Sequence, residues 1–185
     1  MTLSSAEIQE ARRVGELVID GFDPDSLRPS SYLLKIGRRI LVERAVGGVI
    51  DTRVTDASVM FEEREMDESG FVVEPGQFYL ASSVEALRLS PRLSGQLSLL
   101  SSLARCGLAG LSSNLICATF GSDAPGTITF EIANVSRQRI RIYPGVRWCH
   151  VFLSWHREPS DLQYRGIYSG ASRPMPADFS RKPSR

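Results

Sequence analysis

The spacing of apolar positions is helical only near the start of the chain. Residues 4–7 (SSAE) have the spacing of a capping box, in which a serine and a glutamate three residues later satisfy free backbone N–H groups. Ile8, Ala11 and Val14 follow at helical intervals. This pattern predicts one amphipathic helix over residues 5–17.

Strict alternation is clearest over residues 127–133. Ile128, Phe130 and Ile132 share one face of an extended segment, whereas Glu131 and its polar neighbours share the other. A β-strand with one buried face is therefore predicted, and Glu131 is directed away from the main apolar layer.

Two more strands are expected nearby. Residues 139–143 alternate in the same way, and residues 146–153 form a more continuous apolar run, which is typical of a strand buried on both sides. Pro-Gly pairs at 75–76, 125–126 and 144–145 each precede a β-rich stretch, and we expect turns there with the glycine at positive φ. Short strands joined by such turns predict a mainly β jelly-roll-like barrel or sandwich.

Composition favours one globular domain. The 185 residues are 42% hydrophobic and 23% charged, which is enough for a single sizeable core. Lys and Arg number 22 against 21 Asp and Glu, and this net charge of +1 argues against a nucleic-acid or anionic-membrane partner. We expect the domain to cover residues 1–171.

The cysteines and the N-terminus point to a cytoplasmic protein. Cys106, Cys117 and Cys149 cannot all pair within one chain, and their spacing fits no paired zinc or redox motif. The first residues lack a basic flank and an apolar core, so neither a secretion signal nor a membrane span is predicted.

Two segments are expected to be irregular. Residues 62–68 (EEREMDE) are a charge run, which indicates a solvated loop or an exposed hairpin tip. Residues 172–185 are basic and contain three prolines, and we expect a flexible tail. A lid that orders over an anionic ligand is the alternative for this tail.

Candidate chemistry begins after an apolar run, where residues 101–108 read SSLARCGL. Ser101 and Ser102 at a strand-to-helix junction can cap a short internal helix, and the same free N–H groups can hold a phosphate. Capping is the simpler prediction. Arg105 lies three residues beyond Ser102, near the same helix end.

This segment resembles the S-S-L-A-R-x-G-L motif of the dCTP deaminase family, the deaminase branch of the trimeric dUTPase superfamily. Further pieces follow in the family's order. They are LRPSSYLLKIG at 27–37, FVVEPGQFYLAS at 71–82, GTITFEIAN at 126–134, YPGVR at 143–147 and YRGIY at 164–168.

The resemblance implies a distorted β-barrel of the dUTPase-like type and a homotrimer with active sites between subunits. It also implies hydrolysis of the 4-amino group of dCTP, which yields dUTP and ammonia, with Mg²⁺ bound to the triphosphate. No catalytic zinc is implied. In agreement, the H-x-E and P-C-x-x-C pair of the zinc deaminases does not occur here.

The family's site residues map onto this chain one by one. Glu131 corresponds to the glutamate that activates water, and Arg105 to the arginine that supports it electrostatically. Ser101 and Ser102 correspond to phosphate-contacting serines. Tyr164 and Tyr168 stand in the C-terminal nucleotide-binding motif.

Several family positions have changed. Leu100 stands where the family has a phosphate-contacting arginine, and Ile167 and Ala171 replace its C-terminal lysine and glutamine. The turn before the glutamate strand is altered, so Asp123 fits the family aspartate only if that turn is shorter. Losing two or three charge-assisted contacts would weaken triphosphate binding by about three orders of magnitude, unless Arg165, Arg173 or Lys182 compensates.

Two other functions stay open. One is a nucleotide diphosphatase of the dUTPase kind, and the other is a trimeric nucleotide-binding or scaffold protein without turnover. A metal site at Cys149 and His150 is disfavoured, because adjacent strand residues point to opposite faces.

Overall fold

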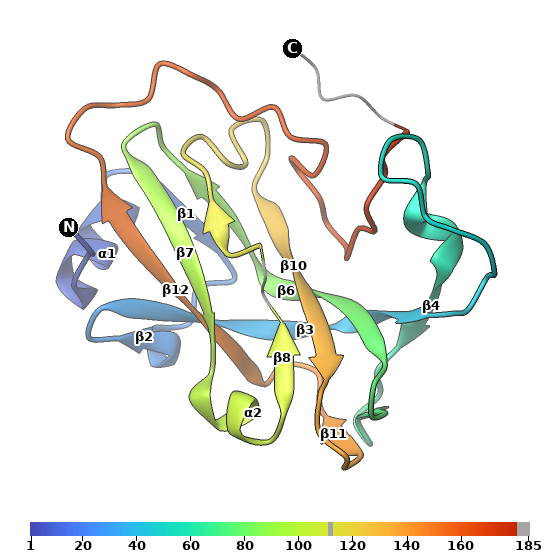
Figure 1. Cartoon of the computed structure of the whole chain (residues 1–185). Coiled ribbons are helices and arrows are strands. Elements are labelled where there is room, and N and C mark those ends of the chain that lie inside the picture. Colours follow the sequence, from blue (N-terminus) through green and yellow to red (C-terminus); the bar gives the residue numbers. More distant parts are fainter. Residues whose placement is uncertain (111–112, 181–185) are drawn as a thin grey trace.

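Antiparallel strand pairing organises the chain, as the computed structural model shows in Figure 1. The structure describes residues 1–110 and 113–180. Within them, ten strands form one strongly curled sheet and two more form a small separate ribbon. The mainly β, barrel-like class predicted from the alternation is confirmed.

The helical elements are short and few in the described part of the chain. They are α1 (Ser5–Arg13), η1 (Pro24–Ser26), η2 (Ala57–Met60) and α2 (Ser101–Arg105). None of them has the length and apolar composition needed to cross a bilayer.

The strands vary widely in length. They are β1 (Leu17–Asp20), β2 (Leu27–Arg28), β3 (Ser31–Glu43), β4 (Phe61–Glu65), β5 (Phe71–Val73), β6 (Phe78–Leu89), β7 (Leu93–Leu99), β8 (Leu108–Gly110), β9 (Leu115–Ile116), β10 (Gly126–Asn134), β11 (Ile140–Ile142) and β12 (Arg147–Trp155).

The long strand β3 joins the two halves of the sheet. The order is β8-β10-β6-β3-β12-β7-β9, with β1 on β6 and with β2 and β4 on β3. The first half of β3 pairs with β12, and its second half pairs with β6 and β4. Its register with β6 shifts between Ile36 and Ile40, and such an irregularity bends a strand. The bend lets the sheet curl around one core.

That core is closed by aromatic contacts between the two halves. Phe130 on β10 stacks on Trp148 on β12 with ring centroids 6.3 Å apart, and both side chains are at most 1% exposed. Tyr32 is also fully buried, and its hydroxyl accepts the N–H of Asp23 at 2.8 Å. Burying such large side chains is the main favourable term in folding.

The predicted helix begins where expected but ends early. Ser4 and Glu7 form the capping box, so this prediction is confirmed. The helix stops at Arg13 and not at residue 17, because Leu17 already pairs with Leu89 in the sheet.

Two of the three Pro-Gly predictions are confirmed. Gly76 and Gly145 adopt φ of +73° and +77°, as the second central position of such a turn requires. The third is wrong, since Gly126 does not have a positive φ and instead begins β10. A Cβ there would lie 3.2 Å from Phe120 and 3.3 Å from the backbone of Gly170, so close packing explains this glycine.

The charge run is partly a strand. Its first residues belong to β4, an exposed edge strand on β3, whereas Met66 is fully buried. Charged side chains protect such an edge from pairing with other chains.

The C-terminal segment lies against the sheet over its described part. The N–H of Ala57 donates to the Ala177 carbonyl and that of Phe179 donates to the Thr55 carbonyl, both at 2.9 Å. Residues 181–185 of the predicted tail lie outside the described residues. The flexibility of the whole segment stays a prediction.

A buried carboxyl group sits at an irregular point of β6. Between its partners Ala86 and Ser82, β6 has extra residues relative to β10, and Glu85 is fully buried there. Its Oε2 accepts the N–H of Lys35 at 2.9 Å, and its Oε1 has no partner among the described residues. Burial raises the pKa of Glu85, because the interior disfavours the charged form.

We expect Glu85→Gln to gain stability relative to wild type as pH rises. The folded chain holds the Glu85 proton more tightly than the unfolded chain, so its stabilisation is complete below about pH 4.3, the ordinary glutamate pKa. It is lost as pH rises through the folded pKa, whereas glutamine stays neutral. Urea unfolding of both proteins across pH 4–8 measures this difference.

The exposed glutamate Glu158, changed to glutamine, serves as the control for losing a surface carboxylate. A difference between Glu85→Gln and wild type that stays constant with pH would show that Glu85 does not titrate in this way.

Candidate active site

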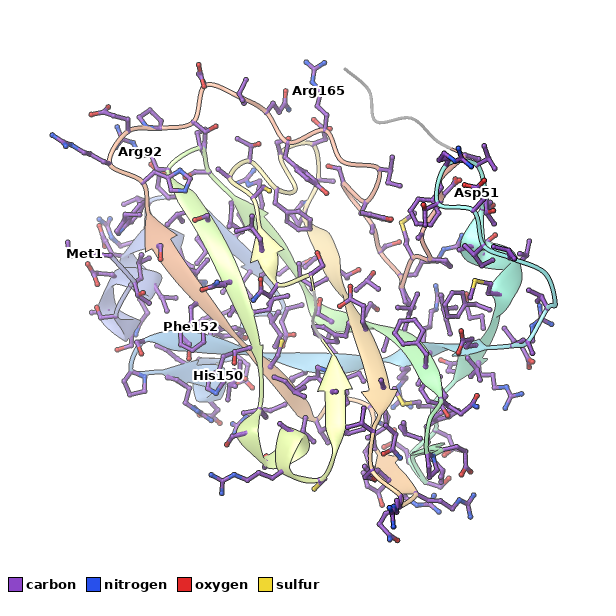
Figure 2. All side chains as sticks on the ribbon, viewed as in Figure 1. Met1, Asp51, Arg92, His150, Phe152 and Arg165 are labelled. Carbon is purple, nitrogen blue, oxygen red and sulfur yellow. The ribbon has the colours of Figure 1, made fainter. Side chains whose placement is uncertain are left out.

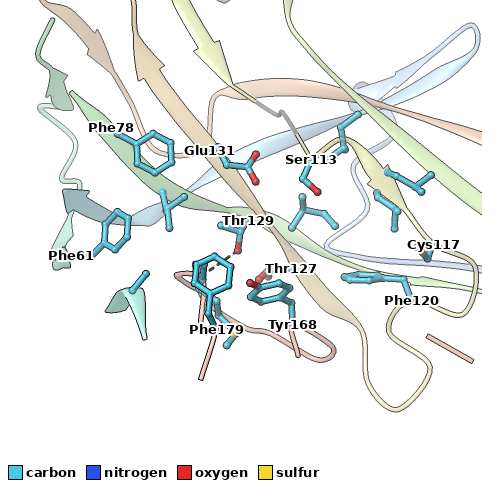
Figure 3. Close-up of a pocket in the computed structure, with 18 of the residues that line it drawn as sticks. Phe61, Phe78, Ser113, Cys117, Phe120, Thr127, Thr129, Glu131, Tyr168 and Phe179 are labelled. Atoms are coloured by element: carbon cyan, nitrogen blue, oxygen red, sulfur yellow. Dashed lines mark hydrogen bonds between the residues drawn. The ribbon is translucent and has the colours of Figure 1, made fainter. Parts of the chain in front are cut away.

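One face of β10 looks into a cavity of about 540 Å³ (Figure 3). Five other parts of the chain complete its walls. They are the segment from Ile50 to Phe61, the start of β6, Leu97 of β7, the stretch from Ser113 to Phe120, and the C-terminal residues from Tyr164 to Phe179. This volume and a mostly apolar lining with a few polar groups are typical of small-molecule sites.

Glu131 points into this cavity, as the alternation along β10 predicted. Its neighbours Phe130 and Ile132 are completely buried on the opposite face. In Figure 3 the carboxylate lies between Phe78 and Ser113. Its buried Oε2 has no hydrogen-bond partner among the described residues. Burial raises the pKa of Glu131, so the group is more basic than an exposed glutamate.

Two threonines on the same face of β10 hold the C-terminal segment. Thr127 donates through both its backbone N–H and its hydroxyl to the carbonyl of Ala171, at 2.7 and 3.0 Å. Thr129 Oγ1 accepts the N–H of Met175 at 3.2 Å, the dashed line in Figure 3. The strand that carries Glu131 therefore also positions the far wall of its cavity.

Both tyrosines of the C-terminal motif line the cavity. Tyr164 packs against Phe120 with ring centroids 5.8 Å apart. The pKa of Tyr168 is raised by burial first and then by the negative charges of Asp178 and Glu131. The Tyr168 hydroxyl thus stays protonated as a donor in the field of Glu131.

Arg105, Ser101 and Ser102 lie elsewhere. All three are exposed on α2, which precedes β8 at the end of the sheet farthest from the C-terminal segment (Figure 1). None lines the cavity, and Arg105 makes no hydrogen bond or ion pair within the described part of the chain. The predicted capping is wrong, because Leu100 is the N-cap and no side chain caps α2. Both serine hydroxyls therefore face solvent.

The positions at which this chain departs from the family pattern place no charged side chain in the cavity. Leu100 is half-buried and its N–H donates to the Trp148 carbonyl. Ala171 is 8% exposed, and Ile167 lines a smaller neighbouring pocket of about 360 Å³. Asp123 is exposed in the turn before β10 and does not line the cavity.

The described residues contain no cluster of three or more metal-ligating side chains. Cys149 is fully buried, whereas the Nδ1 of its neighbour His150 hydrogen-bonds Ser31 Oγ at 2.8 Å. His150 also stacks on Phe152, and Figure 2 shows the two rings together. His156 and Glu158 do have H-x-E spacing, but no P-C-x-x-C accompanies them.

Sequence reasoning missed the aromatic wall. Phe61, Phe78 and Phe179 line the cavity from three different segments. No local sequence pattern predicts that these three side chains lie together, because only the pairing of segments distant in sequence brings them to one cavity. Phe61 and Phe78 contact each other at 6.2 Å between ring centroids.

Comparison with known proteins identifies the family. Residues 2–154 match the family described as dCTP deaminase-like. The chain belongs to the dCTP deaminase-like family. The protein named "dCTP deaminase, dUMP-forming" of Persephonella marina is 32% identical over 170 residues, which cover 92% of each chain. The protein of the same name from Corynebacterium kroppenstedtii is 34% identical and covers 89% of this chain and 87% of its own.

A solved structure shares the fold of this family member. It is the 2'-deoxycytidine 5'-triphosphate deaminase of Agrobacterium tumefaciens, with a TM-score of 0.64 and 19% identity. The match covers 82% of this chain and 47% of that one, so the chain spans about half the length of that structure.

We expect the Glu131 carboxyl to titrate above the ordinary glutamate value of about 4.3. Burial disfavours its ionised form, and none of the residues that the structure describes places a cation on it to offset this. Side-chain carboxyl NMR of wild type and Glu131→Gln, recorded over pH 3–8, identifies the Glu131 signal by its loss in the variant. A midpoint at or below the ordinary value would contradict the desolvated environment.

Proposed function

We propose that this protein is a hydrolytic deaminase of a deoxycytidine nucleotide, with dCTP as the first candidate and dUTP and ammonia as products. The observation that carries the proposal is the half-buried Glu131 carboxylate, which faces a ligand-sized cavity and has a raised pKa. A carboxylate of raised pKa is a better general base near neutral pH. Membership of the dCTP deaminase-like family and its named relatives supports the substrate.

In this mechanism Glu131 removes a proton from a water molecule that attacks C4 of the cytosine. The C4–N bond then breaks, and the amino group leaves as ammonia with the proton held by Glu131. The remaining hydroxyl proton moves to N3 and gives uracil. The apolar walls exclude bulk water and strengthen the electrostatic contacts of the base. Mg²⁺ would enter with the triphosphate as part of the substrate.

A shared site in a homotrimer accounts for the distance between α2 and the cavity. Within one subunit Arg105 does not reach Glu131, yet Arg105, Ser101 and Ser102 are exposed. A neighbouring subunit could bring its α2 to the open side of the cavity. Arg105 would then stabilise charge that develops on the base, and the serines would complete the nucleotide site.

The reaction product distinguishes the deaminase from the two other candidate functions, a nucleotide diphosphatase and a non-catalytic binding protein. The relatives are named for forming dUMP, which requires phosphoanhydride cleavage in addition to deamination. A diphosphatase would need a carboxylate to position water at phosphorus, and Asp123 does not line the cavity. We therefore propose deamination alone. Release of pyrophosphate would indicate the second activity, and binding without any product would indicate a non-catalytic protein.

Glu131→Gln is expected to lower ammonia release from dCTP by about 10²–10⁴-fold, the usual contribution of a general base. Enzyme-coupled ammonia detection and chromatography of the nucleotides measure the loss and the product. Folding is checked by thermal unfolding. If wild type releases ammonia and the variant keeps its rate, Glu131 is not the base.

Mixing subunits tests the shared site. We expect Glu131→Gln and Arg105→Ala each to be inactive, whereas trimers refolded from an equal mixture regain about a quarter of wild-type activity, because one site in four combines both intact residues. Light scattering measures the mass of the assembly. A monomeric mass, or no recovery from two inactive variants, would contradict the shared site.

A further inference from the structure

Thr119 has a strained backbone conformation. Its φ is +63°, and within residues 1–110 and 113–180 it is the one residue other than glycine with a positive φ. A β-branched residue is disfavoured in this left-handed region, because its side chain crowds the neighbouring backbone. Residues strained in this way persist only where the surrounding structure fixes them, and they are frequent at functional sites.

Backbone contacts hold the turn that contains Thr119. The Thr119 carbonyl accepts the N–H of Ser122 at 3.1 Å. The Phe120 carbonyl accepts the N–H of Leu89, at the end of β6, at 2.9 Å. Gly121 follows with a φ of +70°, and a Cβ there would lie 2.4 Å from a backbone oxygen of β6. Because these contacts use backbone groups, they do not depend on the side chain at position 119.

The side chain of Thr119 makes a contact that glycine cannot make. Its Oγ1 accepts the backbone N–H of Tyr164, which lies 45 residues farther along the chain. The Tyr164 ring packs on Phe120, the residue after Thr119, with ring centroids 5.8 Å apart. A glycine at this position would remove the strain, but it would also remove the hydroxyl. The strained residue therefore supplies the group that holds the start of the C-terminal segment.

This hydrogen bond anchors one end of the loop that carries Tyr168, which we call the Tyr168 loop (residues 164–171). The other end is anchored at Ala171, whose carbonyl accepts the N–H and the hydroxyl of Thr127 at 2.7 and 3.0 Å. Tyr164 and Tyr168 both line the cavity that Glu131 faces. The Thr119 hydroxyl thus determines where one wall of the cavity begins.

We infer that Thr119 is a positioning residue, which holds the Tyr168 loop where Tyr164 and Tyr168 can contact a bound nucleotide. Thr119 does not line the cavity itself and acts through Tyr164. Glu131 is carried by β10, so its position does not require this hydrogen bond. The inference rests on the proposed function for the identity of the ligand.

Three substitutions separate the hydroxyl from the strain. Thr119→Val keeps the β-branched shape without the hydroxyl, Thr119→Ser keeps the hydroxyl, and Thr119→Gly removes both the hydroxyl and the strain. We expect the valine and glycine variants to raise the KM for dCTP about three- to tenfold, the effect of one neutral hydrogen bond. Their kcat stays within about twofold of wild type, because the base is not displaced. The serine variant retains the wild-type KM.

Amide hydrogen exchange, measured by NMR, tests the anchor directly. We expect the Tyr164 amide to exchange about three- to tenfold faster in Thr119→Val and Thr119→Gly than in wild type and Thr119→Ser. The Leu89 amide is the matched control, because it donates to the Phe120 carbonyl and reports whether the turn is intact. Equal exchange of the Tyr164 amide in wild type and Thr119→Val would overturn the inference.

Thermal unfolding distinguishes positioning from a role in folding alone. Thr119→Gly and Thr119→Val both lack the hydroxyl, but only the glycine relieves the backbone strain. We expect Thr119→Gly to unfold at a higher temperature than Thr119→Val and yet to show the same raised KM. A KM that follows the unfolding temperature, and not the presence of the hydroxyl, would contradict a positioning role.

Failure of the proposed function has a different signature. If wild type releases no ammonia from dCTP, the deaminase proposal fails, and calorimetric titration with dCTP replaces the KM measurement. We then expect the two variants without the hydroxyl to bind dCTP about three- to tenfold more weakly. Equal affinities in all four proteins, or no binding of dCTP by wild type, would overturn the role of Thr119 in binding.

Discussion

The two-sided environment of β10 is the constraint on which the rest of the site depends. Ile128, Phe130 and Ile132 are buried in the core, and Phe130 stacks on Trp148 from the other half of the sheet. Because side chains alternate along a strand, fixing this apolar face leaves Glu131 one direction, into the cavity. Core packing and the orientation of the proposed base are thus one structural feature.

The same strand assembles the cavity around that base. Thr127 and Thr129 hold the backbone of Ala171 and Met175, and the C-terminal segment continues to hydrogen-bond Ala57 and Thr55. Three segments distant in sequence therefore meet over one face of β10. Their hydrogen bonds use mostly backbone groups, which leaves the side chains to form a largely apolar wall.

Glu85 and Glu131 show how the surroundings of a carboxyl group decide whether it has a structural or a chemical role. Burial raises the pKa of both Glu85 and Glu131. Glu85 is sealed in the core and accepts the N–H of Lys35. Glu131 lies at a cavity, and its Oε2 has no partner among the described residues. Desolvation of Glu85 lowers the stability of the folded chain at high pH. The same desolvation makes Glu131 a candidate base, because Glu131 faces a cavity where it can contact a ligand.

The sequence by itself determined the local features: the capping box of α1, the Pro-Gly turns at Gly76 and Gly145, and the face of β10 that carries Glu131. Each depends on neighbours a few residues apart. Only the tertiary structure decided the burial of Glu85, the aromatic wall, and the separation of Arg105 from Glu131 within one chain. These depend on a register shift in β6 and on contacts between distant segments, such as the bond between Thr129 and Met175. No short-range pattern encodes such pairings, because they are selected by how the whole sheet curls around its core.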